Sequence, residues 1–346
     1  MNIQLPVQIP PMKCWQFSAF PLAILLNHEQ SLEWMFSSFI QVSGHTNFLT
    51  HPVPFGFYEV DYAYNPWLKV HRLDRSLMPV FRTSIKELVI DCLKRGYYLY
   101  LNLDEFYVPN RVPYQKFNRS HDVLVYGFDE EEELFHLLGY NERLIFDKTT
   151  ISFAEFEQAY HSLEEVPNYC HQIYLYQFNE KGAFTFDIEL VIQSLKEYLY
   201  SRNTAAKYKL LAEPEPTFLF GMQTYEILQG YMEHLIGSPD GYVDLRYMHM
   251  LWEHKHWMTR RVQFLIEKGY LQPGADLLEK ASHIEKSSES ARNMLIKFYR
   301  SRNTANVHAV KQILEQIRQS ESLFVEQLIE ALSLPEVYYE RKAEGM

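Results

Sequence analysis

Three side chains that lie far apart in this sequence have the residue types that thiol chemistry needs. Cys14 stands near the amino end, and His121 and Asn141 flank two strand-like segments joined by a short acidic turn. Both residues lie ten positions from Glu131, the midpoint of that turn. A symmetric antiparallel hairpin therefore predicts that they face each other on one side of the sheet, with Cα atoms about 4.5–5.5 Å apart.

An imidazole beside a cysteine gives the thiol a place to leave its proton, because the thiolate and not the thiol is the nucleophile. Asn141 would hold the ring of His121 in orientation, and the amide of Gln8 would donate to an oxyanion. Asp104, Asp122 and Asp147 compete with Asn141 for the orienting role. The competing interpretation is that His121 is a polar residue at a strand edge and Asn141 belongs to a turn, with one bulge enough to separate them.

A basic loop precedes His121 directly. Residues 110–120 contain Arg111, Lys116 and Arg119 and no acidic residue. In an acidic protein this loop is a candidate for binding a phosphate or the acidic surface of a partner, against the alternative of an ordinary solvated loop. Asp104, which ends a strand-like segment before this loop, is expected to point into the same cleft.

Other patterns do not predict a metal or a nucleotide cofactor. His249, Glu253 and His256 share one helical face, but they do not form the HExxH pattern and the sequence suggests no further ligand. We interpret these histidines as packing groups and predict no metal. The sequence contains neither a GxGxxG stretch nor a P-loop, so no nucleotide cofactor is expected.

Composition and charge argue against a nucleic-acid-binding, membrane-bound or secreted protein. The chain has 346 residues and a net charge of −11, which argues against nucleic-acid or anionic-membrane partners because these require basic faces. The amino end lacks the pattern of a signal peptide, and the apolar runs are too short to cross a bilayer. Three cysteines without a CxxC pair suit reduced thiols, so we expect a cytoplasmic protein.

Hydrophobic periodicity divides the chain into an α+β domain over 1–180 and an α-helical domain over 185–346. In the first, helical spacing predicts helices over 19–39, 84–96 and 152–160. Cys92 falls on the buried stripe of the second helix, which Gly96 ends. Strand composition predicts a central antiparallel sheet from 97–103, 121–128, 134–140 and 172–178. Past residue 184 the pattern predicts helices only, one of them over 217–236.

The order Gln8, Cys14-Trp15, His121 at a strand start and Asn141 is similar to that of papain-like cysteine enzymes. The chain resembles in particular the N-terminal domain of the butirosin biosynthesis protein H family, found in antibiotic and nonribosomal-peptide biosynthesis. Three segments carry this resemblance, which covers about residues 8–178: LNLDEFYVPN (101–110), SHDVLVYGFDEEEELFHLLGYNE (120–142) and ISFAEFEQAY (151–160). Pro21 and the asparagine at 141, where aspartate is common in closer relatives, depart from the pattern.

The resemblance implies a papain-like fold and an acyl transfer. An acyl thioester on the phosphopantetheine arm of an acyl or peptidyl carrier protein would pass through Cys14 to a small amine acceptor. His121 would be base and acid, Asn141 the orienting residue and Gln8 the oxyanion donor. The carrier-bound acyl-phosphopantetheine is then a substrate, and no cofactor is implied. The same residues suit a papain-like peptidase or amidase, and a catalytically silent carrier-binding scaffold is the non-enzymatic alternative.

Overall fold

The computed structural model describes residues 1–59, 61, 63–211, 213, 216–272 and 276–333. Contacts between Cα atoms divide the chain into two compact units. Unit 1 contains Met1–Leu32 and Asp61–Phe184, and unit 2 contains Glu33–Val60 and Thr185–Met346. The division at 184 lies close to the boundary predicted from periodicity. The segment 33–60 is different, because the sequence pattern assigned it to the first domain and its contacts belong to the second unit.

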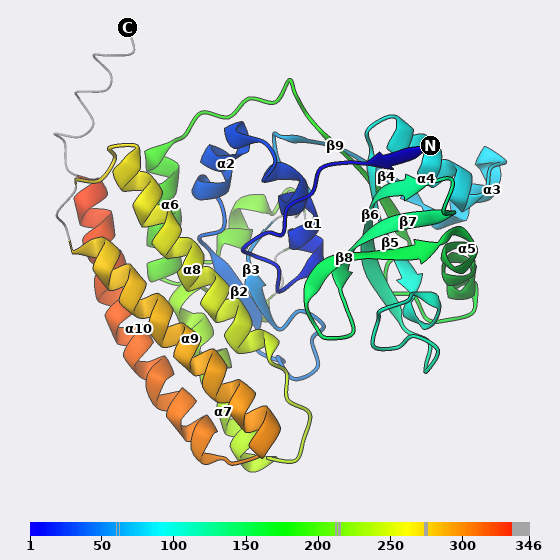
Figure 1. The fold of residues 1–346 in the computed structure, drawn as a ribbon. Helices are drawn as coiled ribbons and strands as arrows, with labels where there is room; N and C mark the ends of the chain where they lie inside the picture. Colours follow the sequence, from blue (N-terminus) through cyan, green and yellow to red (C-terminus); the bar gives the residue numbers. More distant parts are fainter. Residues whose placement is uncertain (60, 62, 212, 214–215, 273–275, 334–346) are drawn as a thin grey trace, which may run out of the picture. The chain divides into compact units, whose positions relative to one another are not determined.

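A seven-stranded antiparallel sheet forms the centre of unit 1 in the described part of the chain (Figure 1). Its order is β4-β9-β5-β6-β7-β8, and β1 pairs with the far end of β6. The strands are β1 (Asn2–Gln4), β4 (Leu68–Asp74), β5 (Tyr98–Asp104), β6 (Ser120–Asp129), β7 (Leu134–Tyr140), β8 (Phe146–Ser152) and β9 (Gln172–Phe178). The predicted antiparallel sheet is confirmed, and β1, β4 and β8 are additions to the four strands predicted.

Helices cover the two faces of this sheet (Figure 1). Helices α4 (Ile85–Lys94) and α5 (Phe153–His161) pack on one face, where alternate residues of β5 and β6 join their apolar stripes in one core. Helix α1 (Gln16–Leu25) contacts β6 and β9, and Phe20 lies 5.2 Å from Tyr100 between ring centroids. The mixed α+β class predicted for this unit is therefore confirmed.

Local signals explain where α4 and α5 begin and end. Ser84 and Ser152 each cap a helix in a reciprocal capping box with a glutamate three residues later. Gly96 follows α4 with φ +80°, a left-handed conformation that glycine adopts without steric cost. Cys92 is 9% exposed in the core under α4, as its place on the apolar stripe predicts.

The single helix predicted over 19–39 is wrong. The chain forms α1, a short 3-10 turn η1 (Glu29–Ser31) and then α2 (Leu32–Ser37). Asn27 ends α1, because its side-chain amide donates to the carbonyls of Ala23 and Ile24 and to that of Pro6. His28 follows in an extended conformation. A polar residue that competes for backbone carbonyls thus interrupts an otherwise apolar stretch.

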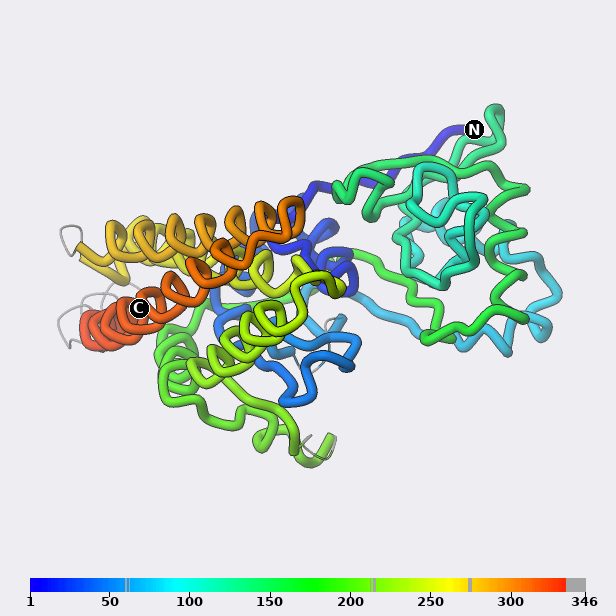
Figure 2. Tube along the Cα trace, turned by 90° about the horizontal axis from the view of Figure 1, so that it is seen from below, coloured from blue at the N-terminus to red at the C-terminus, as the bar shows by residue number. Residues whose placement is uncertain are grey.

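Helices dominate unit 2, and α8, α9 and α10 run side by side in both views (Figures 1 and 2). Its helices are α2, α6 (Ile188–Leu199), α7 (Tyr225–Gly237), α8 (Arg246–Glu267), α9 (Leu277–Ser301) and α10 (Ala305–Leu332). None of the helices in the described residues combines the length and the apolar character needed to span a bilayer.

The prediction of helices only beyond residue 184 is wrong at one place. Residues 218–220 form β10 (Phe218–Phe220), which pairs with β2 (Val42–His45), and β2 pairs with β3 (Phe55–Phe57). The helix predicted over 217–236 begins only at Tyr225. Hydrophobic periodicity does not reveal strand β10, because its partner β2 lies in the segment 33–60, far away along the chain.

Polar side chains without solvent access tie this unit together. Lys255 and Glu321 are 2% and 1% exposed and form an ion pair of 2.7 Å. Lys255 also donates to the hydroxyl of Tyr198, and Tyr225 donates to the second oxygen of Glu321. Arg261 donates to the carbonyls of Phe36, Ser38 and Phe39, which holds the end of α2 against α8.

Candidate functional site

Cys14 lies at the amino end of α1. It immediately precedes Trp15, the residue that caps this helix without a side-chain hydrogen bond. The Cys14 side chain is buried, with 7% of its surface exposed. Pro21 lies within the helix and not in its first turn. Cys14 therefore stands just before the N-cap, next to the helix end whose N–H groups carry the positive partial charge.

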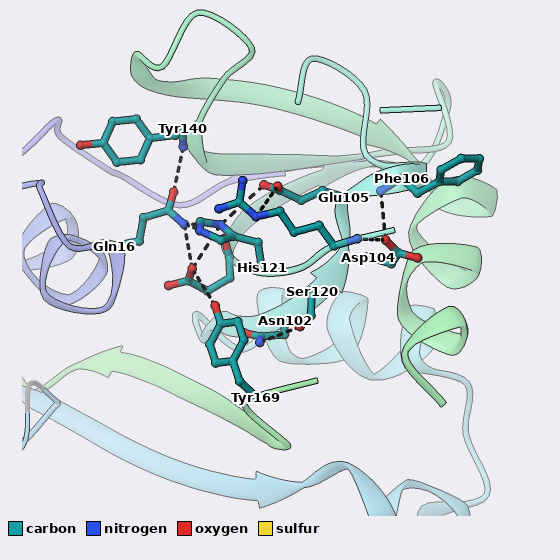
Figure 3. Close-up of polar contacts among 11 residues, drawn as sticks. Gln16, Asn102, Asp104, Glu105, Phe106, Ser120, His121, Tyr140 and Tyr169 are labelled. Atoms are coloured by element: carbon teal, nitrogen blue, oxygen red, sulfur yellow. Dashed lines mark hydrogen bonds and ion pairs between the residues drawn. The ribbon is translucent and has the colours of Figure 1, made fainter. Parts of the chain in front are cut away.

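Gln16, two residues after Cys14, contacts His121 at the start of β6 (Figure 3). Its Nε2 lies 3.1 Å from His121 Nδ1, across 105 positions of sequence. The same Nε2 donates to the backbone carbonyl of Asp122 at 2.8 Å and to its Oδ1 at 2.9 Å. Gln16 Oε1 accepts the backbone N–H of Tyr140 at 2.8 Å.

The carboxamide of Gln16 takes the place of a rung in the β6–β7 ladder. That ladder has a bulge between Val125 and Gly127 and ends at the pair Leu124↔Leu138. Continued by two residues, the register would bring Asp122 opposite Tyr140. Instead, the carbonyl of Asp122 and the N–H of Tyr140 both bond to the inserted amide, which offers an N–H donor to one strand and a carbonyl acceptor to the other as a peptide group does, and has a second N–H besides. The strands separate here, and the amino end of α1 is anchored between them.

Two buried carboxylates face the imidazole. Asp122 Oδ1 lies 3.3 Å and Glu105 Oε1 3.5 Å from His121 Nδ1. Glu105 and Asp122 are 4% and 6% exposed, whereas the His121 side chain keeps a quarter of its surface. Charges in such a low-dielectric place interact more strongly than on the surface. Nδ1 of the ring thus lies close to two carboxylate oxygens in the interior of the unit.

Arg111 is buried in this cluster and does not lie in a solvated basic loop. Only 2% of its surface is exposed, and its three side-chain nitrogens have no hydrogen-bond acceptor among the described residues. Burial lowers the pKa of Arg111, while Glu105 and Asp122 act in the opposite direction. A Cβ on Gly139 would lie 2.8 Å from both Arg111 Nη2 and Gln16 Oε1, so a side chain at that position would displace the guanidinium or the amide.

Asp104 is a structural group and not a ligand in a cleft. It is fully buried and accepts hydrogen bonds from the side chains of Asn118 and Ser162 and from the N–H groups of Phe106 and Arg119. Figure 3 shows the contact with Phe106. Burial raises the pKa of Asp104, but the four hydrogen bonds together lower it by more, so the pKa lies below its usual value. The carboxylate fixes the loop that carries Arg119 to the end of β5.

The structure places Asn141 and Gln8 away from the roles expected from sequence. Asn141 Oδ1 accepts the N–H groups of Arg143 and Ile145 in the β7–β8 turn, and no hydrogen bond joins it to His121 in the described structure. Because Gln16 ends the ladder early, the predicted His121–Asn141 pairing does not form. Gln8 is exposed, and its amide donates to the carbonyl of Leu26, past the carboxyl end of α1.

The remaining predicted binding residues lie on the surface. Lys116 is exposed and donates to the carbonyl of Val112. Arg119 is half-exposed, with Nε 3.8 Å from Glu105. Only these two of the three basic residues predicted in this loop are available to an anion in solution.

The histidines of α8 pair with carboxylates. His249 lies 3.1 Å from Glu253, and His256 lies 2.8 Å from Glu285 on α9. Among the described residues, no group of three or more candidate metal ligands gathers at one place.

The sequence predicted only some of the residues that surround His121. Asp122 is one of the candidates for the orienting role. Neither Glu105 nor Gln16 could be predicted, because each lies in a different element and no local pattern links it to His121. Cys170, the third cysteine, is half-buried in the same unit, and burial raises the pKa of its thiol.

No protein-family model matches the chain, and no curated protein matches it either.

Proposed function

We propose that this protein is a cysteine-dependent acyltransferase that takes an acyl group from a carrier-protein thioester and passes it to an amine. One observation carries the proposal. The chain holds the residue two places after Cys14 within 3.1 Å of an imidazole nitrogen, 105 positions away. A thiol at a helix amino end, an imidazole and buried carboxylates are the parts that nucleophilic acyl chemistry requires.

In this proposal Cys14 attacks the thioester carbonyl and His121 receives the thiol proton. Asp122 and Glu105 replace Asn141 as the groups that orient and stabilise the charged ring. Backbone N–H groups at the start of α1, and not Gln8, would face the oxyanion. The papain-like arrangement, the carrier-protein donor and the cytoplasmic location remain parts of this proposal that derive from the resemblance. The exposed pair Lys116 and Arg119 would meet the acidic surface of the carrier.

The test is the intact mass of the protein after mixing with an acyl-pantetheine thioester. We expect an increase equal to one acyl group that disappears in Cys14→Ala and persists in the control Cys170→Ala. Asp122→Asn should slow its formation, and Asn141→Ala should not. An adduct that survives Cys14→Ala would refute the assignment of the nucleophile. An adduct formed from peptide esters as readily as from thioesters would favour a peptidase or amidase instead.

The burial of Cys14 favours a second candidate, a catalytically silent scaffold that binds a carrier protein. A sulfur with 7% of its residue surface exposed suits a core position as well as an active site. The scaffold predicts no adduct from any thioester, together with carrier binding that weakens when Lys116 and Arg119 are changed to glutamate. Acyl transfer without such binding would exclude it.

A further inference from the structure

The orientation of the Gln16 carboxamide is fixed by two backbone groups. A backbone N–H can only donate and a backbone carbonyl can only accept. Oε1 must therefore be the atom that faces the N–H of Tyr140, and Nε2 the atom that faces the carbonyl of Asp122. Gln16 is also 5% exposed. A flipped amide would put like groups together at both contacts, so the assignment follows from the geometry of the ladder.

We infer that Gln16 is a positioning residue that selects the tautomer of the neutral His121 ring. The two nitrogens in contact lie 3.1 Å apart, and an amide nitrogen has no lone pair with which to accept a hydrogen bond. The contact is attractive only if Nδ1 of the ring carries the lone pair. The neutral ring then has its proton on Nε2, and its basic atom points toward the amino end of α1.

The groups around the ring support its second protonation state as well. Once Nδ1 is protonated, it can donate to Asp122 Oδ1 at 3.3 Å or Glu105 Oε1 at 3.5 Å. Gln16 keeps its contacts with the carbonyl and the Oδ1 of Asp122.

Three further side chains bear on these two carboxylates. Arg111 is close enough to both for its charge to act on them, the Arg119 Nε lies 3.8 Å from Glu105, and the Tyr169 hydroxyl donates to Asp122. Nδ1 of the ring therefore has a hydrogen-bond partner in both states: Gln16 when the ring is neutral, and a carboxylate when Nδ1 is protonated. A group that accepts a proton and later returns it needs such partners in both states.

This inference deepens the proposed function and rests on it for its catalytic meaning. The S–H bond of Cys14 breaks and its electron pair stays on sulfur, while the proton forms an N–H bond at His121 Nδ1. The result is a thiolate and an imidazolium, with no change in total charge. The thiolate attacks the thioester carbonyl, the bond from that carbonyl to the pantetheine sulfur breaks, and this sulfur leaves with the proton of the imidazolium as a thiol. The amine then attacks the acyl-enzyme, its proton passes to the neutral imidazole, and the C–S bond to Cys14 breaks. The imidazolium returns the proton to the Cys14 sulfur, so the thiol and the neutral ring are both restored. Without Gln16, the two carboxylates would place the neutral ring's proton on Nδ1, the wrong atom for this transfer.

The test is the nitrogen-15 NMR spectrum of the His121 ring in the full-length protein, at a pH where the ring is neutral. We expect the Nδ1 resonance of an unprotonated nitrogen and the Nε2 resonance of a protonated one. In Gln16→Met, which has no donor, the tautomer ratio should shift about fivefold or more toward Nδ1–H, the factor that one net hydrogen bond supplies. Gln16→Glu retains the acceptor for Tyr140 and should shift the ratio in the same direction.

Gln8→Met is the matched control, since Gln8 bonds to the carbonyl of Leu26 and should leave the ring unchanged. A neutral ring protonated at Nδ1 in the unaltered protein would overturn the inference, whether or not either variant folds. An unchanged tautomer in a folded Gln16→Met would do the same. The acyl adduct on Cys14 is measured separately. If the ring has the expected tautomer but no acyl adduct forms on Cys14, the result counts against the proposed function and not against the role of Gln16. If the adduct forms but the ring has the opposite tautomer, the result counts against the role of Gln16 and not against the function.

Discussion

Removing either charge of the buried Lys255–Glu321 pair should destabilise unit 2 strongly, with opposite dependence on pH. We consider the variants Glu321→Gln and Lys255→Met. Each leaves a charge that is nearly inaccessible to water and lacks its counter-ion, since Lys255 is 2% and Glu321 1% exposed. The loss for breaking such a pair is about 3–5 kcal/mol at neutral pH. The hydrogen bond that Lys255 donates to Tyr198 and the one that Glu321 accepts from Tyr225 do not replace the missing charge.

The direction with pH follows from which charge is left. Burial lowers the pKa of Lys255, and Glu321 opposes this effect. In Glu321→Gln the opposition is gone, so the folded protein releases the Lys255 proton at a lower pH than the unfolded chain does. Its free energy of unfolding should therefore recover as pH rises between these two values, by up to about 1.4 kcal/mol per pH unit. In Lys255→Met a carboxylate remains, and a proton relieves it, so stability should recover as pH falls.

The measurement is urea unfolding of the full-length protein, followed by a signal from unit 2, at several pH values. The control pair is Lys311 and Glu233, whose ion pair of 3.0 Å lies on the surface of the same unit. Lys311→Met and Glu233→Gln should each change the free energy of unfolding by less than about 1 kcal/mol. Parallel pH profiles for the two buried variants, or losses no larger than those of the control, would refute the assignment of a desolvated ion pair.

Two further changes test the packing around the candidate site. Gly139→Ala places a methyl group 2.8 Å from Arg111 and Gln16 and should cost about 1–3 kcal/mol in urea unfolding; Gly237→Ala, where no atom lies within 4 Å of the added Cβ, should cost nothing. Asp104→Asn should lose about 1.5–3 kcal/mol at pH 7, because it removes an ionised acceptor. The pKa of Asp104 is lowered in the folded protein. Its contribution to the free energy of unfolding is therefore complete at pH values above its pKa in the unfolded chain, and it is lost as pH falls through its pKa in the folded protein. The difference from the unaltered protein should therefore shrink below about pH 4, and a constant difference would contradict it.

Local sequence signals predicted the elements that depend on local interactions. The capping box of Ser152 and the glycine after α4 marked real helix ends, and strands β7 and β9 have the predicted bounds. These features arise from hydrogen bonds and steric limits within a few residues. Their positions are therefore written in short stretches of sequence.

The candidate site depends on a long-range insertion that no local pattern encodes. The hairpin arithmetic for His121 and Asn141 assumed that two strands pair to their ends, whereas a side chain from α1 separates them. The same limit applies to Arg111. Its neighbours in sequence suggest a basic surface, but the fold buries its guanidinium against Gly139 and close to Glu105.

The discontinuous composition of unit 2 has a consequence for the order in which the protein is made. Besides its neighbour β3, strand β2 pairs with β10, the end of α2 is held by α8, and Arg261 is 225 positions from Phe36. During synthesis, segment 33–60 and then residues 61–184 would leave the ribosome before the partners of 33–60 in residues 185–346 have been made. Unit 1 can therefore assemble first, while an apolar stretch awaits its partners, a setting in which chaperones commonly act. Cutting the gene at codon 184 would divide one folding unit and not separate two.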